Sequence, residues 1–212
     1  MICIFKKDKK LRITFIAFLI WTVLFPIWRN EMTKLPLDLP ISISPPSHID
    51  TKIYVPLSEP YHLWLEFDRE NITIENAKKV FGDGERDKGV PIPVRWEVYS
   101  ISSGECILSG EKQTLGAQSW SKDNVGRLIG YVTDGSKKVL DPGEYRFVAY
   151  VQQDVPQFSA YKARIKMALP VDGGFSWQCS VIFWGSIFEQ LIWIVDFLLL
   201  AVVVRKHYGG DL

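Results

Sequence analysis

The stretch VIFWGSIFEQLIWIVDFLLLAVVV, from Val181 to Val204, decides how this chain is organised. A helix of about 20 apolar residues spans the hydrocarbon core of a bilayer, which is roughly 30 Å thick. The stretch holds sixteen Leu, Ile, Phe and Val residues, and together they favour insertion by about 7 kcal/mol. Glu189 and Asp196 oppose insertion by roughly 6 kcal/mol if both lie at the membrane centre. We therefore predict a transmembrane helix over residues 181–204.

A second apolar run, Ile13 to Trp28, follows a basic N-terminal segment at residues 1–12. Signal peptides and uncleaved anchors both begin in this way. The run ends in the bulky residues Phe25-Pro26-Ile27-Trp28, whereas signal peptidase requires small residues at its cleavage site. No lipid-attachment cysteine follows the run. We therefore predict a second transmembrane helix over residues 13–28.

Basic residues predict the orientation of both helices. Five Lys or Arg residues precede the first run and Arg205-Lys206 follow the second, whereas the inner flanks carry only Arg29 and Lys34 nearby. Cytoplasmic flanks carry the excess of positive charge. Both termini, including a tail at residues 205–212, are therefore expected in the cytoplasm, with the central region on the other side of the membrane.

The central region divides by composition. Prolines recur from Leu35 to Pro60, and proline fixes φ and removes a hydrogen-bond donor. Residues 29–55 are therefore predicted to form a proline-rich periplasmic spacer. Residues 56–170 form the predicted domain, and residues 171–180 a short linker to the second helix.

The predicted domain alternates apolar and polar residues, which is the pattern of half-buried strands. The predicted strands are residues 61–67, 92–98, 106–113, 127–133, 144–151 and 161–169. One short helix is expected from Thr73 to Phe81, ended by Gly82. The pattern Leu140…Pro142-Gly143…Tyr145 is similar to the turn and corner tyrosine of immunoglobulin-like domains. We predict an all-β chain: an antiparallel immunoglobulin-like β-sandwich with one short helix, flanked by two transmembrane helices.

Several short motifs resemble an uncharacterised family of β-sandwich domains from the envelope of Gram-negative bacteria. These motifs are Pro56-Leu57-Ser58-Glu59-Pro60-Tyr61, GVPIPV at 89–94, Gly130-Tyr131, Pro142-Gly143-Glu144-Tyr145-Arg146 and Asp154-Val155-Pro156. The resemblance covers residues 55–169 and implies a periplasmic location. It implies no activity and no functional residues, because none is established for the family. The two membrane helices depart from the lipoprotein form of the family.

Composition argues against several classes of function. The formal net charge of the 212 residues is +1, so we expect no nucleic-acid binding, which requires a basic excess. No common catalytic or cofactor motif is present, and we expect neither an enzyme nor a cofactor. The acidic loop GDGERDKG at 82–89 departs from a calcium-binding loop, since Lys88 replaces the required glycine. Cys106 and Cys179 form a possible disulfide, although two unpaired thiols are favoured.

The polar residues Glu189, Gln190 and Asp196 are the predicted intramembrane contacts. Glu189 and Asp196 are seven residues apart, so they share one helix face. The favoured interpretation is a contact with another helix, either with Thr14 and Thr22 of the first span or with the second helix of another copy. The alternatives are an outward shift that brings Glu189 to the headgroups, and a proton or ion relay.

The alternating basic residues Lys162, Arg164 and Lys166 form a possible partner-binding surface on the last predicted strand. The favoured interpretation is structural, because charges on an exposed strand protect a sheet edge from aggregation.

These features together predict a membrane-anchored periplasmic domain that binds another protein. An immunity-type inhibitor of a toxin that acts in the periplasm is the more specific hypothesis. The alternative is a structural or accessory subunit of an envelope complex that assembles through its transmembrane helices.

Overall fold

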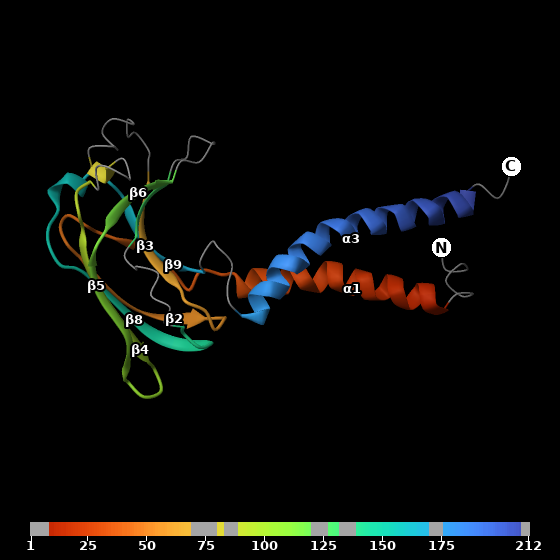
Figure 1. Cartoon of the computed structure of the whole chain (residues 1–212), viewed down its shortest axis with the longest axis horizontal. Coiled ribbons are helices and arrows are strands. Elements are labelled where there is room, and N and C mark those ends of the chain that lie inside the picture. Colours follow the sequence, from red (N-terminus) through yellow and green to blue (C-terminus); the bar gives the residue numbers. More distant parts are fainter. Residues whose placement is uncertain are drawn as a thin grey trace. The chain divides into compact units, whose positions relative to one another are not determined.

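The computed structural model describes residues 9–68, 80–82, 89–119, 127–131, 139–169 and 176–208 (Figure 1). The chain divides into two compact units. One is helical and comprises Met1–Thr33 and Phe175–Leu212, and the other is the β unit Lys34–Gly174. We describe each unit by itself.

The helical unit contains two long helices that run in opposite directions (Figure 1). They are α1 (Lys9–Met32) and α3 (Trp177–Tyr208). Within the described residues, one segment is long and apolar enough to cross a membrane, Trp177–Val195 of α3. The structure thus supports one of the two predicted spans by length and composition. It also places the start of α3 inside the predicted linker at 171–180, and α1 runs beyond both ends of the predicted 13–28 helix.

The β unit consists of two antiparallel sheets, which confirms the β-rich class (Figure 1). Their strand orders are β1-β9-β3-β7-β6 and β2-β8-β4-β5. The strands of the first sheet are β1 (Leu37–Ile41), β9 (Ala163–Ala168), β3 (His62–Phe67), β7 (Arg127–Tyr131) and β6 (Leu115–Ser119). The strands of the second sheet are β2 (His48–Val55), β8 (Gly143–Val151), β4 (Pro93–Ser100) and β5 (Cys106–Gln113).

The predicted spacer at residues 29–55 is wrong, because it contains the last turn of α1 and two strands of the β unit, β1 and β2. The proline pattern misled the prediction for a physical reason. Pro40 lies in β1, which is an edge strand, and an edge strand tolerates proline because one side of its backbone forms no ladder bonds. Strand β2 contains no proline. The domain therefore begins about twenty residues earlier than predicted, near residue 34.

One hydrophobic core lies between the two sheets. Leu65 and Ile165 from the first sheet and Val94 and Phe147 from the second are completely buried in it. These residues occupy alternate strand positions, so the period-two pattern of the sequence is the packing pattern of the core. The corner tyrosine is also present, because the Tyr145 hydroxyl donates to the Asp141 carbonyl at 2.8 Å.

A cluster of aromatic rings closes one part of the core. Phe81 contacts Phe67, Phe158 and Tyr161 at ring-centroid distances of 4.9, 5.3 and 5.6 Å, each edge to face. Phe81 ends the predicted short helix, where residues 80 and 81 are helical and Gly82 has a φ of 77°. The rest of that helix and the acidic loop at 83–88 lie outside the described residues.

Candidate functional site

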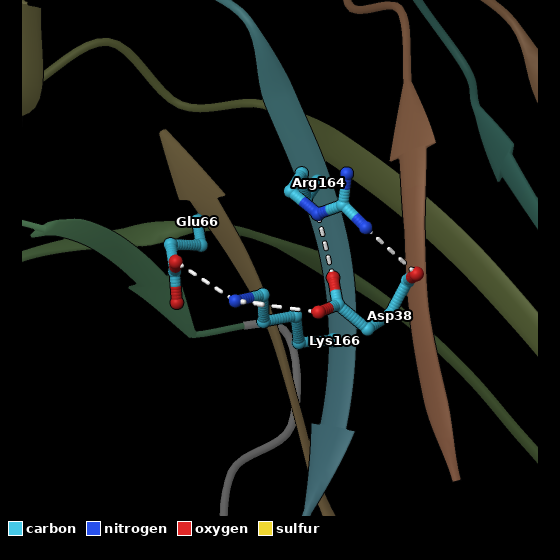
Figure 2. Close-up of polar contacts among 4 residues, drawn as sticks. All are labelled: Asp38, Glu66, Arg164 and Lys166. Atoms are coloured by element: carbon cyan, nitrogen blue, oxygen red, sulfur yellow. Dashed lines mark hydrogen bonds and ion pairs between the residues drawn. The ribbon is translucent and has the colours of Figure 1, made fainter. Parts of the chain in front are cut away.

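The predicted basic surface on β9 is an internal ion-pair network (Figure 2). Arg164 Nε donates to the Asp38 carboxylate at 2.6 Å, and Arg164 Nη2 donates to the Asp38 carbonyl at 2.9 Å. Lys166 Nζ lies 2.8 Å from Glu66 Oε1 and 3.6 Å from Asp38 Oδ2. The network joins β1, β9 and β3, three adjacent strands of one sheet.

Burial corrects the functional interpretation of this network. The side chains of Lys166 and Glu66 are each 11% exposed, so the ammonium group is occupied and inaccessible to a partner. Arg164 is half-buried, and Lys162 precedes β9 and is exposed. The edge-protection interpretation is also wrong, because β9 lies between β1 and β3 and is not an edge strand. The outward side of β9 therefore holds the sheet together.

Trp64 lies opposite Lys166 in the pairing of β3 with β9. Its indole Nε1 is buried and has no hydrogen-bond acceptor among the described residues. The outward side of this sheet is thus buried and polar around Lys166.

In the helical unit, Glu189 of α3 binds Arg29 of α1. Arg29 Nη1 donates to Glu189 Oε2 at 2.6 Å and to Ser186 Oγ at 3.2 Å. The sequence left two partner helices open for Glu189: the first span, through Thr14 and Thr22, or the second helix of another copy. The Thr22 hydroxyl instead donates to the Phe18 carbonyl of its own helix at 2.8 Å. The cation that neutralises Glu189 is Arg29, one of the two basic residues on the inner flanks of the predicted spans.

A glycine brings the two helices together beside this ion pair. A Cβ atom added to Gly185 of α3 would lie 2.3 Å from the Phe25 ring of α1. Phe25 is buried, stacks on Trp21 at 4.8 Å and lies beneath the Arg29 guanidinium at 5.7 Å. Small residues permit this close approach of helices in membranes, where packing replaces the hydrophobic effect.

The other predicted intramembrane residues lie further along α3. Gln190 is exposed, and Asp196 lies seven residues after Glu189. The side chain of Asp196 is outside the part of the chain that the structure describes, as is that of Thr14.

The best candidate for a binding surface is the outer face of the four-stranded sheet, which sequence reasoning missed. We define this outer face by the outward side chains of β2, β8 and β4. They are His48, Asp50, Lys52, Tyr54, Glu144, Arg146, Val148, Tyr150, Arg95, Glu97 and Tyr99. Tyr54 is 59% exposed and Tyr150 is 41% exposed. Tyrosine and arginine are the residue types that most often supply binding energy in protein interfaces.

Carboxylates on the same face hold both arginines in place. Arg146 makes a two-point ion pair with Asp50, its Nε lying 2.8 Å from Oδ1, and its guanidinium lies 5.9 Å from the Tyr99 ring. Glu97 accepts hydrogen bonds from Arg95 Nη2 and from the Tyr99 hydroxyl, both at 2.6 Å. Side chains that are already ordered lose less entropy on binding a partner.

These contacts shift the pKa values of the face. The hydrogen bond from Arg146 lowers the pKa of Asp50 below its ordinary value. Hydrogen bonds from Tyr99 and then Arg95 lower the pKa of Glu97. The hydrogen bond to Glu97 raises the pKa of Tyr99. Both carboxylates are therefore ionised and the tyrosine is neutral at physiological pH.

An open hollow of about 590 Å³ lies at one end of this outer face. It lies over the pair formed by Asp50 and Arg146, and its wall includes Tyr99 and Ile101. Ile101 is 42% exposed and follows the end of β4. The hollow therefore offers a partner an apolar wall beside a fixed cation.

Strand alternation alone contained a signal for this face. The alternation of β4 and β8 leaves Arg95, Tyr99, Arg146 and Tyr150 on the sides opposite the apolar residues. Their assembly into one surface requires β2 and its pairing with β8. The sequence predicts a spacer at residues 29–55, which include β2, so this pairing was not foreseen.

Cys106 and Cys179 are not joined by a disulfide in the structure. Cys106 is exposed at the start of β5, and its thiol donates to the Leu108 carbonyl at 3.4 Å.

The comparisons with known proteins give one family and one solved structure. A family model described as a domain of unknown function (DUF5625) matches residues 38–169. A search of curated proteins finds no match. A crystal structure of a protein from Sulfurospirillum deleyianum is similar over 64% of this chain and 98% of that chain, with 17% identity and a TM-score of 0.43.

Proposed function

We propose that this chain, which belongs to the DUF5625 family of domains of unknown function, is a membrane-anchored protein-binding module of the bacterial envelope. The observation that carries the proposal is the outer face of the four-stranded sheet, where exposed tyrosines alternate with arginines that carboxylates hold in place. Such a face combines large contact area with little loss of side-chain entropy on binding. The partner docks on this face, with Tyr54 and Tyr150 as its main contacts.

The arrangement in the membrane is part of the same proposal. Helix α3 supplies one candidate span, and we assign α1 as a second, because it contains the uncharged run Ile13 to Trp28. The packing of Phe25 against Gly185 and the ion pair of Arg29 with Glu189 support two helices inserted as a pair. Both termini then lie in the cytoplasm and the β unit in the periplasm. The corner contact of Tyr145 supports an immunoglobulin-like arrangement of that unit.

Labelling of a single cysteine tests this orientation. Cys106 is exposed on the β unit, so a membrane-impermeant maleimide added to intact spheroplasts should label a chain in which Cys106 is the sole cysteine. A cysteine placed at residue 207 in a cysteine-free chain is the matched control and should react only after lysis. Labelling of residue 207 before lysis would reverse the assigned orientation.

The more specific proposal is that the partner is a toxin that acts in the periplasm, and that this chain is its immunity-type inhibitor. The support is the combination of a small anchored β domain with an ordered binding face. An inhibitor acts by covering its target, so contacts of tyrosine and arginine on one face are sufficient for the task.

In-cell photo-crosslinking tests the binding face directly. A photoreactive phenylalanine analogue replaces Tyr150 in the full chain, and the same analogue replaces exposed Lys162, which precedes β9 of the other sheet, as the control. We expect a specific adduct from position 150, lost when Tyr54→Ala is added, and no adduct from position 162. Equal adducts at both positions, or adducts at neither, would contradict the proposed face.

The alternative function, an accessory subunit that assembles through its helices, now depends on Asp196. Glu189 is already neutralised within the chain by Arg29 at 2.6 Å, which removes one of the two carboxylates from the contact with a partner helix. If Asp196→Leu abolishes function while Tyr150→Ala leaves it intact, the helices carry the function and the binding-module proposal fails.

A further inference from the structure

Among the strands that the structure describes, β2 is an open edge of the four-stranded sheet. It runs for eight residues, His48–Val55, without glycine or proline, and pairs with β8 on one side only. An exposed edge of this length is a template for a further strand, and proteins usually block such edges with proline, bulges or charged side chains, lysine above all. Strand β2 carries one such lysine, Lys52, which excludes strands that cannot place a carboxylate opposite it. The absence of proline and glycine makes β2 suited to pairing.

The hydrogen-bonding phase of β2 identifies which residues face the open side. Val151 N donates to the Ser47 carbonyl at 3.0 Å. His48 opposes Tyr150 in the register of β2 and β8, so Ser47 opposes Val151, and these two residues form a hydrogen-bonded pair. In an antiparallel pair, alternate residues form the hydrogen-bonded pairs. Odd-numbered residues of β2 therefore bond to β8, and the backbone groups of even-numbered residues point to the open edge.

The sequence of β2 is complementary to itself about Thr51. When a second copy of His48-Ile49-Asp50-Thr51-Lys52-Ile53-Tyr54 lies antiparallel to the first with Thr51 opposite Thr51, Asp50 opposes Lys52. Ile49 opposes Ile53, and His48 opposes Tyr54. Asp50 and Lys52 are even-numbered residues, and the backbone groups of even-numbered residues point to the open edge. In this register Asp50 and Lys52 of the two copies can therefore form hydrogen-bonded pairs.

We propose that two copies of this chain dimerise by antiparallel pairing of their β2 strands about Thr51. The pairing joins two four-stranded sheets into one sheet of eight strands and extends the outer face across the two-fold axis. Charge selects the register. If the two-fold axis passed through residue 52 instead of Thr51, Lys52 of one copy would lie opposite Lys52 of the other. If it passed through residue 50, Asp50 would lie opposite Asp50. Like charges directly opposite each other destabilise a strand pair.

The other described sheet edges lack this complementarity. Strand β1 has five residues and contains Pro40, and β6 has no charged residue. In β5 the charged residues Glu111 and Lys112 are adjacent, so they lie on opposite faces of the strand and cannot oppose each other in an antiparallel self-pair. The choice of β2 therefore follows from its sequence as well as its position.

Charge reversal in the full chain tests the proposal. Light scattering after gel filtration in detergent should give a protein mass of twice 24.3 kDa for the wild type. Asp50→Lys and Lys52→Asp each place like charges opposite each other at both symmetric positions, so each variant alone should elute as a monomer. An equimolar mixture of the two variants restores both opposite-charge pairs and should form a heterodimer, which capture of the untagged variant by the tagged variant detects.

The matched control is Glu111→Lys on the opposite edge of the same sheet, which changes the charge by the same amount as Asp50→Lys and should leave the dimer intact. Three outcomes would overturn the proposal: a wild-type monomer at 100 µM chain, a dimer that survives both reversals, or equal loss with Glu111→Lys. A dimer that survives both reversals and is lost with Asp196→Leu would place self-association on α3.

A second variant tests the register without changing charge. Thr51 opposes itself in a non-hydrogen-bonded pair, where Cα atoms lie about 4.5 Å apart, within the range that a disulfide bridges. In a chain whose native cysteines are replaced by serine, Thr51→Cys should crosslink to a covalent dimer on mild oxidation, whereas Glu111→Cys should not. Failure of Thr51→Cys to crosslink in a sample of dimeric mass would overturn the register.

Discussion

Replacement of Lys166 by methionine should destabilise the β unit strongly. Methionine preserves the packing of the aliphatic stem but removes the ammonium group, which lies 2.8 Å from Glu66 and 3.6 Å from Asp38. Glu66 is then left as a carboxylate with 11% of its side chain exposed and without this cation. Loss of one partner of a buried ion pair costs about 3–5 kcal/mol, and we expect about 3 kcal/mol because methionine recovers some apolar contact.

The matched comparison is Arg164→Gln in the same network (Figure 2). The side chains of Arg164 and Asp38 in this ion pair are 40% and 35% exposed, and an exposed pair contributes no more than about 1 kcal/mol to stability. The loss of unfolding free energy caused by Lys166→Met should thus be about three times that caused by Arg164→Gln, although both residues lie on β9 and have a carboxylate partner. The difference arises from burial, because water screens the charge left behind by Arg164→Gln more effectively than it screens Glu66, whose side chain is 11% exposed.

Thermal unfolding of the full chain in detergent, followed by near-ultraviolet circular dichroism, measures both effects. For a domain of this size about 3 kcal/mol corresponds to a fall in Tm of roughly 10 °C. The double variant Glu66→Leu with Lys166→Met removes both charges and should recover most of the loss. If Lys166→Met lowers Tm no more than Arg164→Gln does, or if the double variant recovers nothing, loss of the Lys166 cation beside a buried carboxylate is not the cause of the destabilisation.

Three other predictions follow from single contacts. Gly185→Ala should weaken the pairing of the two helices by about 1–3 kcal/mol, because the new methyl group overlaps the Phe25 ring; an unchanged thermal unfolding curve of the helical unit would contradict this packing. Tyr145→Phe should cost about 1 kcal/mol in urea unfolding, because it removes the corner hydrogen bond of 2.8 Å; a value near zero would show that the corner contributes nothing. The pair of Asp50 with Arg146 lowers the pKa of Asp50, so its contribution to stability is present above the ordinary pKa of 3.8 and disappears as the pH falls through the lowered value. The stability difference between wild type and Arg146→Gln should therefore shrink as the pH falls towards that range, and a difference that is constant with pH would refute the linkage.

The sequence by itself determined the strands from β3 onwards in which apolar and polar residues alternate, whereas β6 (Leu115–Ser119), which lacks this alternation, was not predicted. In β8 and β9 the residues predicted on one face, such as Phe147 and Ile165, are the ones buried between the sheets. The turn at Pro142-Gly143 and its corner tyrosine were also predictable, because both depend on residues within five positions of each other. Length and composition alone were sufficient to predict the apolar helix α3. These features are local, so the amino-acid order is sufficient to specify them.

Only the tertiary structure decided the partners of the charged residues. Arg164 pairs with Asp38, which lies 126 residues earlier, and Arg29 pairs with Glu189, which lies 160 residues later. Such contacts depend on which strands and helices become neighbours. They reversed the interpretation of β9 from a surface to an internal network, and they brought β2 beside β8 to form the outer face. A side chain's spacing along the chain predicts which face of its strand or helix it lies on, but what covers that face is decided by distant segments that pack against it.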